Sequence, residues 1–293
     1  NQATNYAGAV YLSNCQSVVT ESNFRSNSTV GLQGVALYAE HCDLILSHNI
    51  FSLNQAINPF APIESIVFVG DNSFTTIDHC NFYDNGGWVE NIILYVSSLS
   101  TVTLQNSIFS DHPYGINIYF ETGSNTSVSY NDFYNSFINF SGSVPTGLGI
   151  ISDVNTNGDP CDTFYNVFLD PLYIDPANGD FHLTEESPCI DAGDPASPLD
   201  PDGTIADMGA FYFHQATPLD PPQNVTIEIS AGEVTLSWDA VTGANSYKVY
   251  SSDDPYSGFI EDSSGSFDGE SWSAPIGDEK RYYHVIASTE VVR

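Results

Sequence analysis

Aspartates gather around glycines between residues 191 and 207, and they are the strongest candidates for metal chemistry in this sequence. The run DAGD begins at Asp191, and DPDG, which contains Asp200 and Asp202, is followed by Asp207. Oxygen ligands on flexible loops are what Ca²⁺ prefers. We therefore predict a calcium site at Asp200, Asp202 and Asp207, with calcium as the one expected cofactor. Turn capping by the same carboxylates is an equal alternative, because the pattern is not that of an EF-hand.

Four more aspartates are the candidates for acid–base catalysis: Asp78, Asp84, Asp111 and Asp132. Glycoside hydrolysis needs only a pair of carboxylates. A lyase that acts on acidic polysaccharides abstracts a proton with Lys or Arg, and residues 1–150 contain a single basic residue, Arg25. No phosphate-binding loop or HExxH motif occurs. We expect a noncatalytic protein, with a polysaccharide-degrading enzyme as the less favoured alternative.

Aromatic side chains at predicted turns are candidates for stacking on sugar rings. They are Tyr83, Trp88 and Tyr134, with Tyr114 nearby. Packing against their own turns is the favoured alternative for each ring. We nevertheless predict weak glycan-binding positions at Tyr83, Trp88 and Tyr134, with a polysaccharide or another cell-surface ligand as partner.

The charge balance excludes several partners. The chain has 37 Asp and Glu against 5 Lys and Arg, which gives a formal net charge of -32. Phosphate recognition needs clustered cations, so we expect no nucleic acid and no anionic membrane surface as a partner. No apolar run approaches the roughly 20 residues that a membrane helix needs, so no membrane span is predicted.

These features together predict a protein outside the cytoplasm. Asn1 falls inside what proves to be a repeat and no signal peptide is visible, so we expect upstream coils and a leader beyond this sequence. The five cysteines form no CxxC motif. Cys161 precedes the segment from 170 to 213, Cys189 lies within it, and the two are predicted to join as a disulfide. The expected localisation is extracellular or at the cell surface.

The candidate residues must be positioned by short segments rich in β-branched residues, which polar turns connect. Segments of this kind repeat five times within residues 1–150. The repeats end at phenylalanines, and an aliphatic residue stands five positions before each of them. The phenylalanines are Phe24, Phe51, Phe82, Phe109 and Phe133, and the aliphatic residues are Val19, Leu46, Ile77, Leu104 and Val128. Fourteen positions before each Phe stand Val10, Leu37, Phe68, Tyr95 and Tyr119. Recurring columns with alternating polarity predict an all-β, right-handed parallel β-helix of about five coils plus a C-terminal cap.

Three further columns predict local roles. Cys15 and Cys42 share a column with serines, which favours a ladder of small side chains over a disulfide between coils. Asn49 and an equivalent Asn131 are expected to cap backbone groups at a bend. His48 and His79 also share a column, and we favour a solvated face there over a metal site.

The chain divides into four predicted parts. Residues 1–150 hold the β-helix repeats and residues 151–214 the C-terminal coils and cap. Residues 215–222 read as a Pro-rich linker. Residues 223–293 contain short alternating strands, typical of a β-sandwich, with Trp238 as a core residue. We expect the segment from 170 to 213 to cover the C-terminal end of the helix, because a β-helix cannot leave an open end.

Two stretches resemble known families. DPLYIDPANGDFHL, SPCIDAGDP and DMGAFYF resemble the C-terminal part of β-helix proteins of bacterial surfaces, including those with choice-of-anchor Q domains. VTLSWDAVTGANSYKVY and RYYHVIAS resemble a fibronectin type III domain. Cys189 departs from the first pattern, where Ala is expected, and this favours its pairing with Cys161.

The expected function is that of a noncatalytic extracellular or cell-surface scaffold, similar to an adhesin, whose β-helix presents a binding or assembly surface. An elongated solenoid suits multivalent attachment. The first alternative is a structural subunit that self-associates, through the end or sides of the β-helix, into a filament or surface layer.

Overall fold

A computed structural model describes residues 2–3, 8–29, 33–56, 64–86, 91–215, 219–277 and 281–289. The chain forms two compact units, Asn1–His214 and Gln215–Arg293. Within the described residues every regular element is a β-strand except one short 3-10 helix, η1 (Pro176–Asn178). No helix in this part of the chain has the length and apolar character needed to span a membrane.

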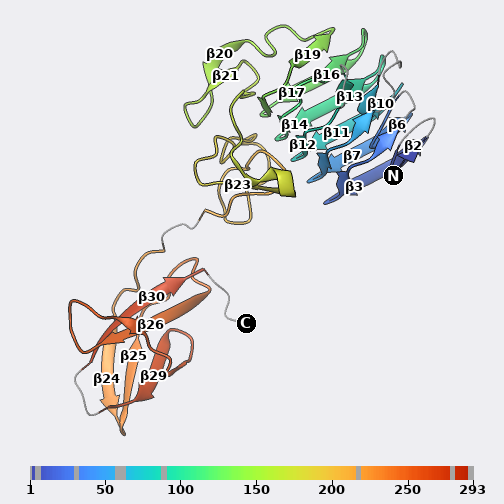
Figure 1. The fold of residues 1–293 in the computed structure, drawn as a ribbon. Helices are drawn as coiled ribbons and strands as arrows, with labels where there is room; N and C mark the ends of the chain where they lie inside the picture. The colour runs from blue at the N-terminus through green and yellow to red at the C-terminus, as the bar shows by residue number, and fades with distance from the viewer. Residues whose placement is uncertain are drawn as a thin grey trace. The chain divides into compact units, whose positions relative to one another are not determined.

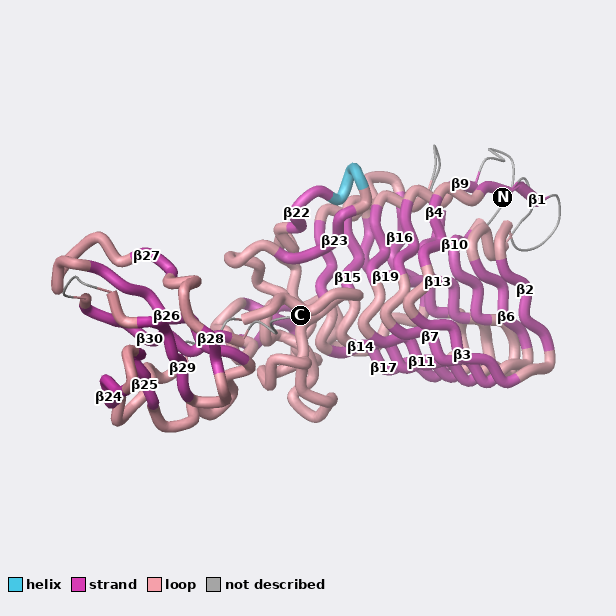
Figure 2. The backbone as a smooth tube through the Cα atoms, turned by 90° about the horizontal axis from the view of Figure 1, so that it is seen from below, coloured by secondary structure: helices cyan, strands magenta, loops and turns pink. Residues whose placement is uncertain are grey.

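The first unit is an all-β parallel solenoid, which confirms this part of the predicted fold (Figures 1 and 2). Three sheets run along it, and successive coils give one strand to each sheet, except that β19 adds a sixth strand to the first sheet alone. The first sheet contains β2 (Val10–Ser13), β6 (Leu37–Glu40), β10 (Ser65–Val69), β13 (Asn91–Val96), β16 (Gly115–Phe120) and β19 (Ile138–Gly142). The second contains β3 (Gln16–Thr20), β7 (Asp43–Ser47), β11 (Phe74–Asp78), β14 (Thr101–Gln105) and β17 (Asn125–Ser129). The third contains β4 (Asn23–Arg25), β8 (Ile50–Ser52), β12 (Asn81–Tyr83), β15 (Ile108–Ser110) and β18 (Asp132–Tyr134).

These stacked strands make about four turns of solenoid. A small parallel sheet of β1 (Gln2–Ala3), β5 (Ser28–Thr29) and β9 (Gln55–Ala56) lies beside them in the pairing order β1, β5, β9.

Single residues in the left-handed conformation turn the chain at the corners of each coil. At the corner between the second and third sheets they are Glu21, His48, His79, Asn106 and Tyr130, with φ between 48° and 55°. At the next corner they are Ser26, Leu53, Asp84, Asp111 and Asn135. This conformation is costly for residues other than glycine, and Asn and Asp tolerate it best. Hydrogen bonds between coils hold it in place, for example from His48 N to Asp78 O at 3.2 Å.

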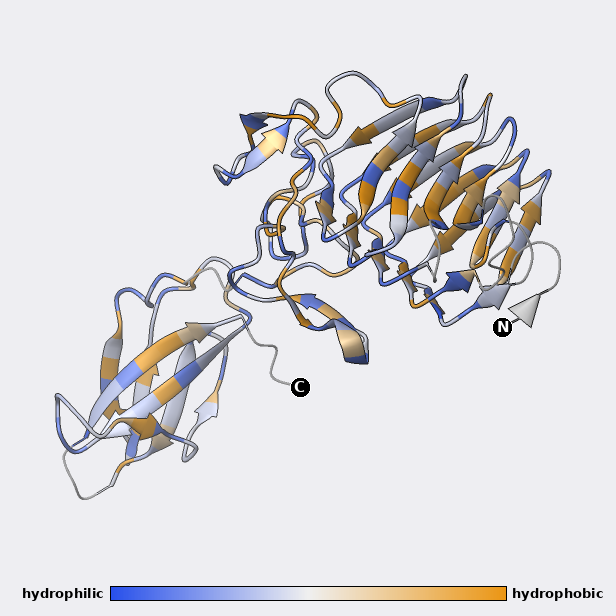
Figure 3. Cartoon of the chain, turned by 45° about the horizontal axis from the view of Figure 1, so that its top comes forward, coloured by the Kyte–Doolittle hydropathy of each residue, from blue (hydrophilic) through white to orange (hydrophobic). Residues whose placement is uncertain are grey.

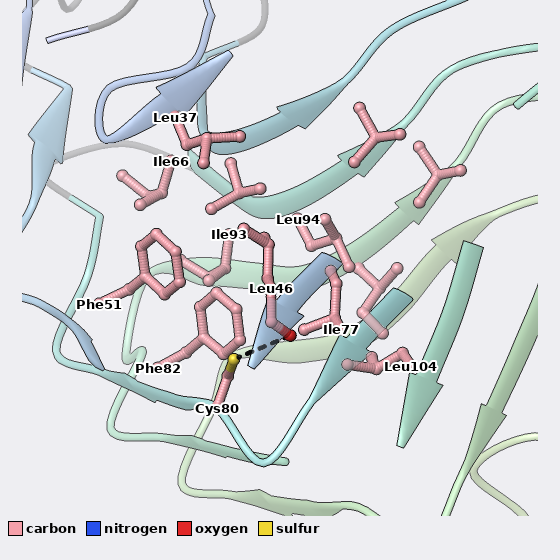
Figure 4. Packing of buried hydrophobic residues seen from close by; sticks show 14 of the residues in the cluster. Leu37, Leu46, Phe51, Ile66, Ile77, Cys80, Phe82, Ile93, Leu94 and Leu104 are labelled. Atoms are coloured by element: carbon pink, nitrogen blue, oxygen red, sulfur yellow. Dashed lines mark hydrogen bonds between the residues drawn. The ribbon is translucent and has the colours of Figure 1, made fainter. Parts of the chain in front are cut away.

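The closing phenylalanines stack through the core, as the sequence predicts. Phe51, Phe82 and Phe109 pair in parallel register and are fully buried. Their ring centroids lie 4.9 Å and 4.2 Å apart, with nearly parallel planes. The aliphatic column beside them, which includes Leu46, faces the same core, where the thiol of Cys80 contacts the Leu46 carbonyl at 3.7 Å (Figure 4). Buried and more exposed residues alternate along strands of the second sheet such as β7, β11 and β14, whereas β10 and β13 of the first sheet are almost continuously apolar and fully buried (Figure 3).

The third predicted column is wrong by one residue. Leu37 pairs with Val67, and Phe68 pairs instead with Tyr38. The reason is an extra residue in the first corner of the later coils, where Gly70 begins a longer turn than the one after Ala39. The aromatic rings of this column therefore stack on the outer face of the first sheet, in the order Tyr11, Tyr38, Phe68, Tyr95 and Tyr119, with centroids 4.6 Å to 5.2 Å apart.

Buried asparagines complete the bends, as predicted for Asn49 and Asn131. The Asn49 side chain accepts a hydrogen bond from Ser22 N and donates one to Val19 O, at 3.0 Å and 2.7 Å. Asn131 likewise accepts from Ser107 N at 3.0 Å. The side chain thus satisfies backbone groups of the neighbouring coil that would otherwise be buried without partners.

Residues 143–168, here called the end cap, cover the C-terminal end of the core. They include β20 (Ile151–Val154) and β21 (Pro160–Asp162), which pair antiparallel. Phe168 lies 6.0 Å from the Phe133 ring, and Leu148 and Phe164 join the core cluster. The buried Asp162 carboxylate orders this segment by accepting hydrogen bonds from backbone N–H groups that include that of Phe164.

Residues 170–213, here called the strap, lie elsewhere than predicted. They contain β22 (Tyr173–Asp175), η1 and β23 (Asp180–Leu183). The strap runs along the outer face of the third sheet and does not cover the C-terminal end. Arg25 of the first coil donates to Ala177 O at 3.2 Å, and Ala210 N donates to Asn81 of the third coil at 3.1 Å. Phe181 packs there among outward-facing side chains of the sheet. The strap is not needed at the C-terminal end of the solenoid, because the end cap already buries the last coil.

The second unit consists of two antiparallel sheets. One contains β24 (Thr226–Ser230), β25 (Glu233–Ser237), β29 (Ser271–Pro275) and β28 (Ser266–Phe267); the other contains β27 (Ile260–Glu261), β26 (Ser246–Ser252) and β30 (Tyr282–Ser288). A single apolar cluster takes residues from both sheets, including Leu236 and Val249. Trp238 belongs to this cluster and lies 5.1 Å from the Tyr247 ring.

The phenylalanine stack predicts a large loss of stability on truncation. Phe82→Ala should lower the free energy of unfolding by about 3–5 kcal/mol, because it removes a fully buried ring between two others and leaves a cavity. Phe74→Ala in the same coil is the matched control: its ring is 60% exposed, and the change should stay within about 0.5 kcal/mol. Urea denaturation followed by circular dichroism measures both. Equal midpoints for the two variants would contradict the stacked core.

Candidate binding cleft

A cleft of about 620 Å³ lies between the strap and one corner of the solenoid. Its solenoid wall is the corner at which the chain passes from the second to the third sheet. Its other wall belongs entirely to the strap. The lining residues are Glu21, Ser22, Asn23, His48, Ile50, His79, His182, Asp200, Pro201, Asp207, Gly209, Ala210, Phe211 and Tyr212.

Two stacked imidazoles form part of the solenoid wall. His48 and His79 occupy equivalent left-handed corner positions in adjacent coils, and their rings are 4.9 Å apart and nearly parallel. Ser47 Oγ lies 2.7 Å from His48 Nδ1. Burial, and then the neighbouring His79, lower the pKa of His48. The neutral imidazole is therefore favoured, and it offers one donor and one acceptor to a ligand.

Asn106 links this wall to the strap. Its side-chain amide donates to Asp78 Oδ1 at 2.9 Å and to Ser197 Oγ at 3.0 Å, and its oxygen accepts from Asp194 N at 2.7 Å. Asp78 also lies 2.9 Å from His79 Nδ1. Burial raises the pKa of Asp78, but the contact with His79 and the bond from Asn106 outweigh it and lower the pKa overall. Asp78 thus supports the corner as an anion.

The strap wall carries aromatic surface. Phe211 stacks on His182 with centroids 4.3 Å apart, and Asp180 Oδ1 holds His182 Nδ1 at 2.7 Å. The next residue, Tyr212, is 41% exposed. Gly209 allows the strap to approach, because its φ is 104° and a β-carbon there would lie 2.7 Å from the Asn81 side chain. The sequence reasoning missed these aromatic residues, although the MGAFYF run contains them.

The aspartates predicted to bind calcium lie on the strap. Asp207 accepts hydrogen bonds from Asp191 N at 2.7 Å and Phe213 N at 2.6 Å, and Asp200 accepts one from Asp207 N at 3.0 Å. Asp202 accepts from Thr204. These bonds are of the turn-capping kind. No group of three or more potential metal ligands occurs among the residues that the structure describes. Calcium binding stays a prediction.

Burial perturbs both cleft carboxyls of the strap. It raises the pKa of Asp207 to about 7, against the effect of its two backbone N–H donors, and it also raises the pKa of Asp200. Desolvation disfavours the charged form when no cation is near. No Lys or Arg is found among the described residues that line the cleft. The cleft therefore offers acceptors, imidazole and aromatic surface, and no cation for an anionic ligand.

The predicted glycan-binding aromatics do not meet in one place. Tyr83 packs under the strap, edge-on to Phe181 at 5.3 Å, as part of a buried cluster. Tyr134 is half-buried on β18, and Tyr114 is 62% exposed beside a separate hollow near Asp84. Trp88 lies outside the described residues. Local packing accounts for Tyr83, and the glycan role of these positions stays a prediction.

The four candidate catalytic aspartates occupy different surroundings. Asp78 supports the cleft corner. Asp84 and Asp111 stand at equivalent corner positions of adjacent coils, and burial and then Asp111 raise the pKa of Asp84. Asp132 is fully buried under the strap, where burial raises its pKa well above the usual range. Its oxygens contact Leu169 N at 3.1 Å and the Cys189 thiol at 3.7 Å.

The cysteines predicted to pair are free thiols in the structure. Cys161 and Cys189 are both fully buried and belong to one apolar cluster beneath the strap. Burial raises the pKa of each thiol. The disulfide between them stays a prediction for an oxidising compartment.

Comparison with family models gives a match to part of the chain. The model of a family described as a domain of unknown function (DUF5123) matches residues 75–196, which cover the later coils, the end cap and part of the strap. No curated protein matches the chain.

The buried Asp132 predicts a distinctive pH dependence. Its folded pKa lies above the unfolded value near 3.9, so its contribution to stability is complete below that pH and is lost as pH rises through the folded pKa. Asp132→Asn should therefore raise the free energy of unfolding at pH 7 by about 1–3 kcal/mol. The gain should shrink toward pH 4. Thermal melts from pH 4 to 8 test this, with the exposed Glu185→Gln as control. A variant less stable at pH 7 than at pH 4, relative to the parent, would contradict it.

Chelation tests the calcium prediction. If Asp200, Asp202 and Asp207 hold an ion, EDTA should lower the melting temperature and added Ca²⁺ should restore it, because a ligand bound only by the folded state stabilises it. Asp202→Asn should abolish the response. An identical melt with and without EDTA would rule the site out.

Proposed function

We propose that this protein is a noncatalytic extracellular scaffold that binds a neutral polysaccharide in the cleft between the strap and the solenoid corner. The observation that carries the proposal is the combination of exposed aromatic surface with neutral and acidic hydrogen-bonding groups in one cleft. Sugars are bound by such combinations, in which a ring face packs on the apolar side of the sugar and polar groups meet its hydroxyls.

Charge selects the class of sugar. The lining residues Glu21 and Asp200 are acidic, and the one basic residue of the first unit, Arg25, is bonded to the strap backbone. A polyuronate would meet repulsion from the cleft and from the whole acidic chain, with no cation to offset it. A neutral chain meets acceptors for its hydroxyl donors. This favours neutral glycans.

Three further features support the scaffold part of the proposal. A parallel solenoid repeats its surface along one axis, which suits multivalent attachment. The acidic composition suits a secreted protein that has no nucleic acid or membrane partner. We also interpret the second unit as a fibronectin type III-like spacer, on its two antiparallel sheets around Trp238 and on its sequence resemblance.

Affinity electrophoresis through gels that contain single polysaccharides tests the proposal. The full chain should be retarded by at least one neutral polymer, such as xylan, mannan or a β-glucan, and not by polygalacturonate or alginate. Tyr212→Ala should weaken binding about fivefold to tenfold, because a stacked ring contributes roughly 1 kcal/mol. Tyr256→Ala is the matched control, since this tyrosine is 94% exposed and belongs to the second unit.

Two results would overturn the proposal. Retardation by polyuronates alone would reverse the charge argument, and equal binding by Tyr212→Ala and the parent would remove the cleft from the interaction. Release of reducing ends from a retained polymer would show that the protein is an enzyme, and the noncatalytic part would then be wrong.

A further inference from the structure

We propose that Cys15 and Cys42 form a disulfide that joins two adjacent coils. The two sulfur atoms lie 3.1 Å apart, although both are free thiols in the structure. Among the residues that the structure describes, this is the one pair of cysteines in side-chain contact. The two cysteines belong to different coils, 27 residues apart in the sequence, and the fold brings their side chains together.

The register of the second sheet fixes this juxtaposition. Cys15 and Cys42 immediately precede β3 and β7, which pair in parallel from Gln16 and Asp43 onward. Asp43 N donates to Cys15 O at 2.9 Å, so the backbone is tied directly at the two cysteines. Neighbouring parallel strands are about 4.8 Å apart, and α-carbons of a disulfide are usually 4.4–6.8 Å apart. The bond therefore requires rotation of side chains and little movement of the backbone.

The column contains no third thiol to compete. The next coil places Ser73 at the same position, where its hydroxyl accepts a hydrogen bond from Cys42 N at 3.2 Å. Cys80 belongs to a different column, and its thiol contacts Leu46 O at 3.7 Å in the core. Cys15 and Cys42 are thus a matched pair, and the small-residue ladder that the sequence predicts continues only from Ser73.

Exposure sets the order of the reaction. Cys15 is partly exposed, whereas Cys42 is 1% exposed. Burial, and then the hydrogen bond with Cys15, raise the pKa of the Cys42 thiol. The Cys15 thiolate is therefore the group that an external disulfide, such as oxidised glutathione, reaches first.

Thiol–disulfide exchange with oxidised glutathione proceeds in two steps. Cys15 thiolate attacks one sulfur of oxidised glutathione, breaks the S–S bond and releases one glutathione thiolate. Cys42 then loses its proton and attacks the Cys15 sulfur of the mixed disulfide, which releases the second glutathione. Two protein thiols are oxidised, and one glutathione disulfide is reduced to two thiols.

The bond would fasten the coil at one end of the described second sheet. β3 has a single hydrogen-bonded neighbour, β7, within the described strands of that sheet. A strand with one neighbour opens more readily than one held on both sides. A covalent link at the start of both strands restricts this opening and reduces the freedom of the unfolded chain.

Mass spectrometry of the full chain tests the inference. The folded protein is incubated with oxidised glutathione, its remaining thiols are alkylated, and it is digested with a Glu-specific protease. This protease separates the two cysteines by cutting after Glu21 and Glu40. We expect a cross-linked pair of peptides that contain Cys15 and Cys42 and that separate on reduction.

Single variants distinguish this route from chance oxidation. Cys42→Ser should leave glutathione attached to Cys15, because the resolving thiol is missing. Cys15→Ser should leave Cys42 largely unmodified, because Cys42 is buried. Alkylation of both Cys15 and Cys42 after oxidation of the folded parent, or linkage of either to another cysteine, would overturn the proposal. Failure of polysaccharide binding would not affect it.

Discussion

Parallel hydrogen bonding between successive coils is the constraint on which the rest of this structure depends. Each coil donates backbone hydrogen bonds to both of its neighbours, for example from Val35 N to Ser65 O and from Asp43 N to Cys15 O, so equivalent residues are forced into columns. A core column buries its members together, and equivalent residues at a corner lie side by side. That is why Phe51, Phe82 and Phe109 share one core and why His48 and His79 share one edge of the cleft.

The same constraint explains which features could be predicted from the sequence. Leu46, Ile77 and the closing phenylalanines recur at constant spacing because no corner between them changes length. The column of Phe68 was misplaced by one residue because the corner that begins at Gly70 is longer than its counterpart in the second coil. An insertion at a corner conserves the alternation of the strands on both sides, so alternation alone does not reveal it.

The strap shows a second limit. Its turns and short strands are visible in the sequence, but its position depends on contacts such as that of Arg25 with Ala177, which are 152 residues apart. Neither an arginine nor an alanine in the sequence indicates that its partner lies so far along the chain. The cleft was therefore missed as a site, even though His48, His79, Asp200 and Asp207 had each been singled out separately. The aromatic wall at Phe211 and Tyr212 was missed for the same reason.

The left-handed corner residues carry a consequence for how this surface changes during evolution. Glu21 and His48 make their inter-coil bonds through the backbone, by donation to Ser47 O and Asp78 O, whatever side chain they bear. Their side chains point away from the core columns, so an exchange there alters the chemistry of an edge and leaves the packed interior intact. Substitutions at these corner positions therefore change which ligand the edge can bind without changing the packing of the core. A protein of this fold can acquire a new ligand through a few substitutions in one corner column.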